Sequence, residues 1–139
     1  MKIIFIADVF ADEIPGGGEL VNQEVIKHLC AAGHTVEQIK SQDVTADYIN
    51  RKNNEGYKFI LGNFLALSAD SVRSIITTEY IVYEHDHKYI TTRDPSQFKD
   101  YLVPKEHLIN DFFYNHAKAV LCQSKGHADI VAKNLPNAN

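Results

Sequence analysis

The chain has 139 residues, of which 45% are hydrophobic and 23% charged, and its formal net charge at pH 7 is −4. This length suits a single domain with a sizeable core. The acidic balance and the lack of a basic cluster argue against nucleic acid as the main partner.

The apolar run after Lys2 ends at Asp8. It is too short for the apolar region of a signal peptide or for a membrane span, so we expect a cytoplasmic protein without a transmembrane segment. Cys30 and Cys122 lie in apolar surroundings and lack metal-ligand spacing. They are predicted to be buried free thiols, which fits a reducing compartment.

The first forty residues predict a strand, a helix and a second strand. Residues 2–7 form a continuous apolar run, which is typical of a central parallel strand buried on both faces. Residues 18–32 carry apolar side chains at helical spacing, and Gly33 marks the helix end. Residues 35–39 alternate in polarity and predict a strand. Together they indicate a parallel strand–helix–strand crossover.

The same alternation of helices and strands continues to the end of the chain. The helices are expected at residues 41–54, 67–78 (with Ser68 or Ser71 as cap), 104–116 and 125–134 (capped by Ser124). The strands are expected at residues 57–62, 80–84 and 119–123. Residues 88–103 have no clear period, so a functional or mobile loop is expected there.

These elements predict an α/β fold, a Rossmann-like doubly wound parallel sheet of about five strands with helices on both faces. The expected strand order is 3-2-1-4-5, which places the topological switch point between the first and fourth strands. Ligands bind at such a point, outside the carboxyl ends of the strands. We therefore expect residues 8–18 and residues 84–87 to line one crevice.

The loop after the first strand contains Gly16, Gly17 and Gly18, followed by Glu19 at the predicted helix start. Such a loop lets the backbone approach a phosphate, which the N–H groups of the next helix would bind. A nicotinamide fingerprint would need glycine at Val21, and a Walker A loop would need Gly-Lys before the helix. A flexible turn without a ligand, and a purely capping role for Glu19, remain alternatives.

Four ionisable residues, Glu84, His85, Asp86 and His87, follow the fourth predicted strand. In an extended backbone the two histidines would point one way and the two carboxylates the other. A histidine near its usual pKa can bind a sugar hydroxyl or transfer a proton at neutral pH. No third ligand motif accompanies the histidines, so no metal is expected.

The glycine loop belongs to a set of motifs that resembles the N-terminal domain of retaining-type GT-B glycosyltransferases, the group 1 or family 4-like class. The motifs are a Lys-Ile strand at the start, Gly16-Gly17-Gly18-Glu19, Gly33-His34-Thr35-Val36, an apolar strand ending in His85-Asp86, and a strand followed by Ser124. The resemblance covers essentially the whole chain.

The resemblance implies that residues 1–139 form a single domain, equivalent to the acceptor-side half of a two-domain enzyme, and that the donor-binding C-terminal domain is absent. The co-substrate would be a UDP- or GDP-linked sugar, with no further cofactor, and the C-terminal domain would be a partner in cis or trans. We expect catalysis at His85 and Asp86. Contacts to the donor diphosphate or substrate are expected from Gly16, Gly17, Gly18, Glu19, His87, Lys88 and Arg93.

Two other functions are compatible with the sequence. The chain could be a stand-alone, non-catalytic binding or interaction module with the same fold. It could also be a nucleotide-dependent oxidoreductase, since Asp43 lies near the end of the second strand. Exposed apolar residues on an interdomain face would favour a homo-oligomer.

Overall fold

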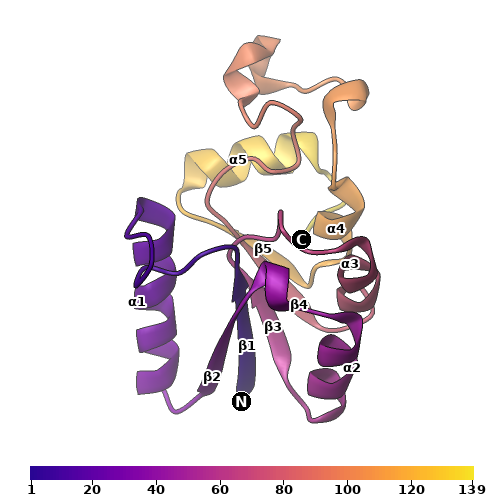
Figure 1. Ribbon diagram of the computed structural model, residues 1–139. Coiled ribbons are helices and arrows are strands. Elements are labelled where there is room, and N and C mark those ends of the chain that lie inside the picture. The colour runs from indigo at the N-terminus through magenta and orange to yellow at the C-terminus, as the bar shows by residue number, and fades with distance from the viewer.

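Five parallel strands form the sheet, each from an apolar or alternating run of residues. The computed structural model describes residues 1–139. The strands are β1 (Lys2–Ala7), β2 (Thr35–Lys40), β3 (Lys58–Leu61), β4 (Tyr80–Glu84) and β5 (Ala119–Cys122). The α/β, doubly wound fold class is therefore confirmed, and Figure 1 shows the strands side by side with helices around them.

The strand order is β2-β1-β3-β4-β5, so the predicted order 3-2-1-4-5 was wrong. β3 lies between β1 and β4, and β2 is an edge strand. The burial of the strands accords with this order, because Phe59, Ile60 and Leu61 are buried, whereas every residue of β2 is at least partly exposed. The topological switch point consequently lies between β1 and β3, where chain connections turn to opposite sides.

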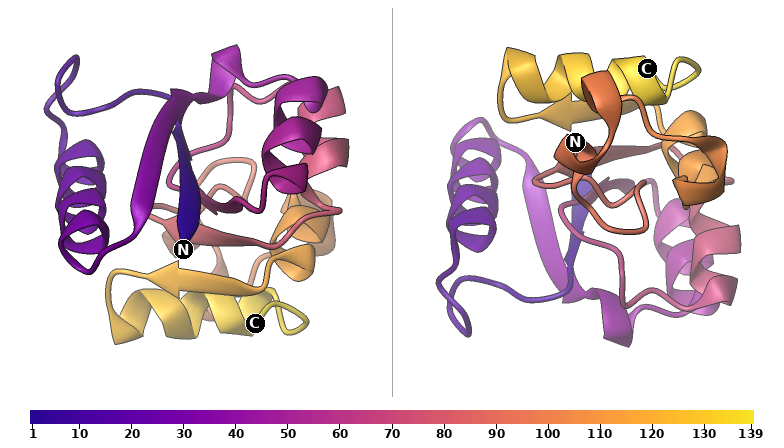
Figure 2. Two further views of the ribbon diagram at one scale, coloured as in Figure 1. Left: turned by 90° about the horizontal axis from the view of Figure 1, so that it is seen from below. Right: turned by 90° about the horizontal axis from the view of Figure 1, so that it is seen from above.

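The helices lie unevenly on the two faces of the sheet. They are α1 (Gly17–Ala31), α2 (Ala46–Asn54), α3 (Ala69–Ile75), α4 (Asp111–His116) and α5 (Lys125–Asn134). α1 packs on one face through a cluster that includes Ile3, Phe5 and Ile26. The other four helices contribute to an 18-residue core on the opposite face. The two views in Figure 2 show α1 alone on its side of the sheet.

Several helix boundaries follow from hydrogen bonds made by side chains. The hydroxyls of Thr45, Ser68 and Ser124 accept the first-turn N–H groups of α2, α3 and α5, so the caps at Ser68 and Ser124 are confirmed. The helix predicted at residues 104–116 was wrong in its first half. Asn110 adopts a left-handed conformation with φ 57°, which separates a short turn at Lys105–His107 from α4.

Half of one sheet face has no helix over it. α1 packs against β2 and β1, whereas Ile81, Tyr83 and Leu121 of β4 and β5 lie on the same face and keep part of their surface exposed. An apolar depression of about 290 Å³ lies near the amino ends of the strands, lined by residues that include Met1, Ile3 and Ile60. Parallel sheets are ordinarily covered on both faces, so this region is unusual for the fold.

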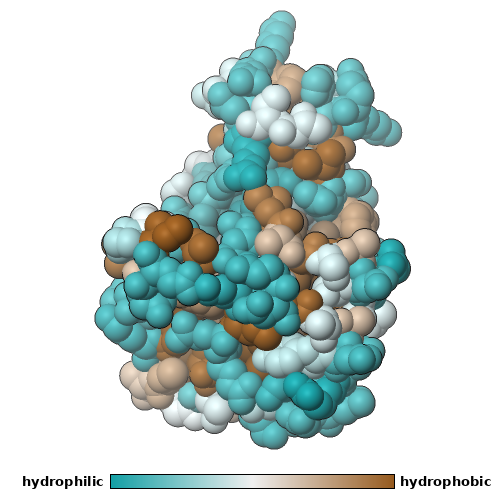
Figure 3. All heavy atoms as spheres, viewed as in Figure 1, coloured by the Kyte–Doolittle hydropathy of each residue, from teal (hydrophilic) through white to brown (hydrophobic).

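A segment that includes residues 93–108 projects beyond the carboxyl ends of the strands (Figure 1). Tyr89 and Ile90 anchor its start, since both side chains are fully buried in the larger core. Three short 3₁₀ turns follow, at Pro95–Gln97, Lys99–Tyr101 and Lys105–His107. Figure 3 shows that hydrophilic residues cover most of this view of the molecule, interrupted by separate hydrophobic patches.

The cysteines are unpaired, as predicted, but the prediction that both are buried was wrong. Cys30 is exposed on α1, and Cys122 is partly buried in β5. Burial, with a contribution from Glu84, raises the pKa of the Cys122 thiol to about 11. None of the helices has the length and apolarity that crossing a membrane requires.

Candidate functional site

A small polar cleft of about 80 Å³ lies where the carboxyl ends of β1, β3 and β4 meet the first turns of α1. Five predicted site residues line it: Gly18, Glu19, His85, Asp86 and Lys88. Gly62 and Asn63, which follow β3, also line it because β3 separates β1 from β4. The glycine loop and the acidic–histidine stretch therefore face one another, as the sequence indicated.

The closest approach between the two stretches is at Gly18. A Cβ atom at this position would lie 3.5 Å from Cγ of His85 and 3.6 Å from Cδ2. These are ordinary van der Waals distances, so glycine leaves the imidazole uncovered at this point without being sterically required. The chain here begins α1, whose first N–H groups are unpaired by helix geometry.

The Glu19 carboxylate lies beside Gly16, which is the N-cap residue of α1. A carboxylate in the first helical turn interacts favourably with the positive end of the helix dipole. It occupies the region where a phosphate would approach Gly16. The Glu19 carboxylate therefore lies next to Gly16, whereas no other atom lies within 4 Å of a Cβ built at Gly17.

Both ring nitrogens of His85 have protein partners. Nε2 lies 2.6 Å from Oδ1 of Asn22 on α1, and Nδ1 contacts the side-chain amide of Gln123 after β5. Burial lowers the pKa of His85, and the positive charge of Lys88 lowers it further. His85 is therefore a neutral imidazole at neutral pH, held between two amide side chains.

Lys88 and Glu84 form a buried ion pair behind the cleft. Their side chains are 3% and 0% exposed, and Lys88 Nζ donates to Glu84 Oε1. The Tyr114 hydroxyl donates to Oε2 of Glu84, and the backbone N–H of Asp86 donates to Oε1. Burial and the Glu84 charge together raise the pKa of Tyr114. Glu84 thus fixes the backbone where β4 ends, and Lys88 is held at the cleft rather than free in solvent.

His87 does not share the surroundings of His85, so the predicted alternation of side chains beyond Glu84 was wrong. β4 ends at Glu84, and the following residues bend. His87 Nδ1 lies 2.8 Å from the Tyr89 hydroxyl, and its ring centroid lies 4.6 Å from that of His127. Burial lowers the pKa of His87, and His127 contributes in the same direction.

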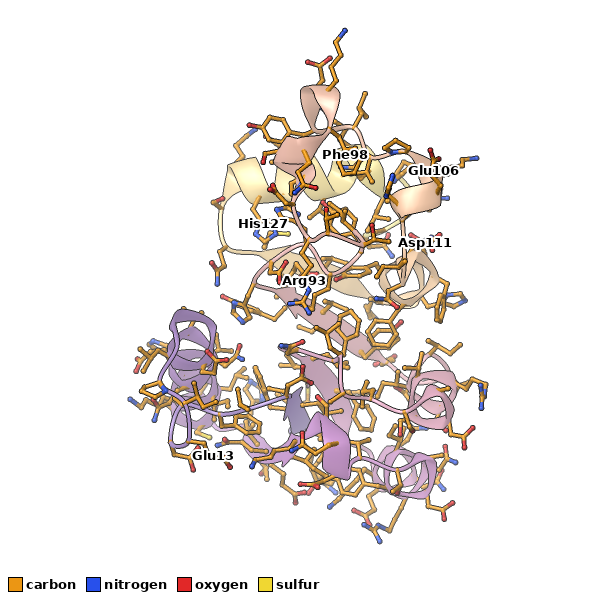
Figure 4. All side chains as sticks on the ribbon, turned by 45° about the horizontal axis from the view of Figure 1, so that its top comes forward. Glu13, Arg93, Phe98, Glu106, Asp111 and His127 are labelled. Carbon is orange, nitrogen blue, oxygen red and sulfur yellow. The ribbon has the colours of Figure 1, made fainter.

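Arg93 lies outside the cleft. Its guanidinium is 3.4 Å from Oδ2 of Asp86, and both side chains are partly exposed. Figure 4 shows Arg93 on the segment that follows β4, with His127 nearby on α5. His127 Nε2 donates to the backbone carbonyl of Asp86 at 2.9 Å. Asp86 is consequently held from both sides, by the side chain of Arg93 and by that of His127.

Four predicted site residues do not line the cleft: Gly16, Gly17, His87 and Arg93. Asn22, Gly62 and Gln123 were missed by the sequence interpretation. Asn22 had a detectable signal, because it is a polar residue four positions before Ile26 on the buried side of α1. Gly62 and Gln123 had none, since their roles depend on contacts between distant segments.

Groups of three or more His, Cys, Asp or Glu side chains placed to hold a metal ion are absent from the chain. The neighbours of His85 are two amides, which hydrogen-bond an imidazole but do not neutralise a cation. The polar groups of the cleft are thus suited to hydrogen bonding with a ligand.

No protein-family model and no curated protein matches the sequence. Among solved structures, the fold is similar to that of an α-glucosyltransferase in complex with UDP and a 13-mer DNA containing a central A:G mismatch, with a TM-score of 0.51 and 11% sequence identity. The match covers 91% of this chain and 38% of the glucosyltransferase chain. The chain therefore has a fold that resembles part of a glycosyltransferase, and it spans well under half of that protein's length.

Proposed function

We propose that the chain is the acceptor-side half of a GT-B glycosyltransferase of the retaining type. In this proposal a sugar passes from a UDP- or GDP-linked donor to an acceptor hydroxyl, and a C-terminal donor-binding domain acts in cis or trans. The observation that supports the proposal most is the polar cleft, in which His85 faces Gly18 at the switch-point end of a glycosyltransferase-like fold.

The charges around the cleft suit this chemistry. Glu19 and Asp86 provide carboxylate oxygens that accept hydrogen bonds from sugar hydroxyls and oppose positive charge on a sugar ring in the transition state. The N–H groups at Gly17 and Gly18 and the positive end of the α1 dipole would face the departing diphosphate. Lys88 would add a fixed positive charge at the same end of the sheet.

The first test is ligand binding to the chain itself. The ¹⁵N-labelled chain is titrated with UDP-glucose, GDP-mannose and methyl α-glucoside, and amide shifts are followed by NMR. We expect the largest shifts at Gly18, Glu19 and His85, and we expect His85→Ala to weaken binding. Shifts confined to other parts of the chain, or no shifts with any of these probes, would contradict the proposal.

The second test is transfer, measured with a donor-binding domain present in cis or trans. His85→Ala is expected to lower kcat about 100-fold, the usual contribution of a positioned acid–base or hydrogen-bonding group. Specific binding without transfer in any such pairing would favour a non-catalytic binding module instead. Calorimetry with NAD examines the oxidoreductase alternative, which tight binding at Asp43 would support.

A further inference from the structure

The contact between His85 and Asn22 identifies the proton on the imidazole. Asn22 Oδ1 lies 2.6 Å from Nε2, and an amide oxygen only accepts hydrogen bonds. Nε2 must therefore carry a hydrogen. On the other side of the ring, the Gln123 amide nitrogen faces Nδ1, and an amide nitrogen only donates. Nδ1 is therefore the unprotonated, accepting atom, and the two contacts specify the same neutral tautomer.

The two amide partners differ in how firmly they are held. Asn22 is 3% exposed and packs against Gly62, where a Cβ atom would lie only 2.6 Å from its Nδ2. Only glycine at position 62 leaves room for the Asn22 side chain. Gln123 is exposed and follows the edge strand β5. A ligand could consequently displace Gln123 from His85 much more readily than it could displace Asn22.

We propose that Asn22 is a positioning residue that keeps His85 in its neutral, Nε2-protonated form, so that Nδ1 accepts a hydrogen bond from a ligand hydroxyl in place of Gln123. The arrangement requires a hydrogen-bond donor on the ligand, and a hydroxyl is the donor that the proposed function supplies. The identity of that ligand as a carbohydrate rests on the proposed function, whereas the tautomer does not. Partial burial of His85 and the neighbouring Lys88 charge both oppose protonation of the ring, which supports the neutral form.

The tautomer is measured directly by long-range ¹H–¹⁵N NMR of the histidine rings in the intact chain at pH 7.5. We expect His85 to show a protonated Nε2 and an unprotonated Nδ1. A protonated Nδ1, or an equal mixture of the two tautomers, would overturn the assignment. This measurement needs no variant, so it does not depend on whether a substituted chain folds.

Asn22→Asp tests the positioning role with an almost isosteric change. A carboxylate at Oδ1 would stabilise the imidazolium, so the pKa of His85 should rise above its wild-type value in an NMR titration. Gln23→Asp is the matched control, because it adds the same charge one residue later on the exposed side of α1. An equal rise in both variants would assign the effect to general electrostatics and overturn the specific role of Asn22.

The ligand step is tested by binding of UDP-glucose to the wild type, Asn22→Asp and Gln123→Ala. Asn22→Asp should bind about tenfold more weakly where His85 is protonated, because Nδ1 then no longer accepts a hydrogen bond. Gln123→Ala should bind a few-fold more tightly, since it removes a competitor for Nδ1. Weaker binding by Gln123→Ala would overturn the displacement step. If no sugar probe binds, although NMR shows the Nε2-protonated tautomer of His85, the proposed function and the hydroxyl contact are rejected. The positioning role of Asn22 would still stand in that case.

Discussion

At the scale of single residues, the main feature is the concentration of buried charge where β4 ends. Glu84 accepts from Lys88, Tyr114 and the Asp86 backbone, so every oxygen of a carboxylate with 0% exposure has a partner. Buried charges are costly unless they are paired and hydrogen-bonded. These bonds fix the backbone that carries His85 and Asp86. A binding site needs such a fixed backbone to hold its side chains in defined positions.

Removal of one partner of this pair should be more damaging than removal of both charges. Lys88→Met leaves the Glu84 carboxylate buried without its counter-ion, so we expect a loss of about 3–5 kcal/mol in the free energy of unfolding. The double variant Glu84→Gln, Lys88→Met should be more stable than Lys88→Met alone. Urea unfolding of the wild type, Glu84→Gln, Lys88→Met and the double variant measures both effects. Strict additivity of the two single substitutions would contradict the coupling.

The histidines predict a pH dependence of stability. Burial lowers the pKa values of His85 and His87 below the value of about 6.5 found in unfolded chains. The unfolded chain therefore binds more protons than the folded chain. The contribution of these histidines to the free energy of unfolding is complete above about pH 6.5 and is lost as the pH falls below it. His87→Gln should flatten that fall between pH 7 and pH 5 in urea unfolding. His28→Gln, at an exposed position of α1, is the control. A slope that His87→Gln leaves unchanged would remove His87 as a cause.

At the scale of elements, the helix caps connect local sequence to the site. Ser124 accepts the N–H of His127 at 3.1 Å, and His127 in turn donates to the backbone carbonyl of Asp86. The first turn of α5 thereby links the end of β5 to the end of β4. Loss of the cap should loosen this link as well as the helix.

Ser124→Ala is expected to lower the free energy of unfolding by about 1 kcal/mol, the usual value of an N-cap. Lys125→Ala serves as the comparison, because its ion pair with Asp129 is solvent-exposed and such pairs contribute about 0.5 kcal/mol or less. Thermal or urea unfolding distinguishes the two. Equal effects of both substitutions would show that the Ser124 hydroxyl is unimportant for α5.

At the scale of the whole molecule, the unequal covering of the sheet is the main departure from an ordinary doubly wound fold. The face that carries α1 leaves Ile81, Tyr83 and Leu121 partly exposed, and Leu121 is 42% exposed. Contiguous exposed apolar surface promotes association. The homo-oligomer considered from the sequence stays a prediction, and this face is where we expect two copies to meet.

Leu121→Gln should therefore reduce both self-association in sedimentation velocity and fluorescence of a bound hydrophobic dye. The stability of the fold should change little, because Leu121 is already 42% exposed. Thr92→Gln, at an exposed position just before the projecting segment, is a control for the substitution itself. A wild-type chain that stays monomeric at high concentration and binds no dye would contradict this prediction.

The fold class was predictable because it depends on local patterns. Apolar runs at β1 and β3, helical spacing in α1 and the glycine at position 33, with φ +95°, each follow from interactions within a few residues. The meeting of Gly18 and His85 was predictable as well, because the carboxyl ends of parallel strands lie at one edge of the sheet. The prediction also rested on β1 and β4 being neighbours, which was wrong, because β3 lies between them.

The strand order and the partners of the site residues were decided by the tertiary structure alone. The chain pattern is compatible with β3 on either side of β1, and the choice depends on how completely Phe59 and Leu61 become buried. The bonds from His85 to Asn22 and Gln123 span 63 and 38 residues, so no local pattern encodes them. The sequence thus determined the fold class and five of the chemical groups that line the cleft. Packing of distant segments determined which of them are buried, which are paired, and which remain open to a ligand.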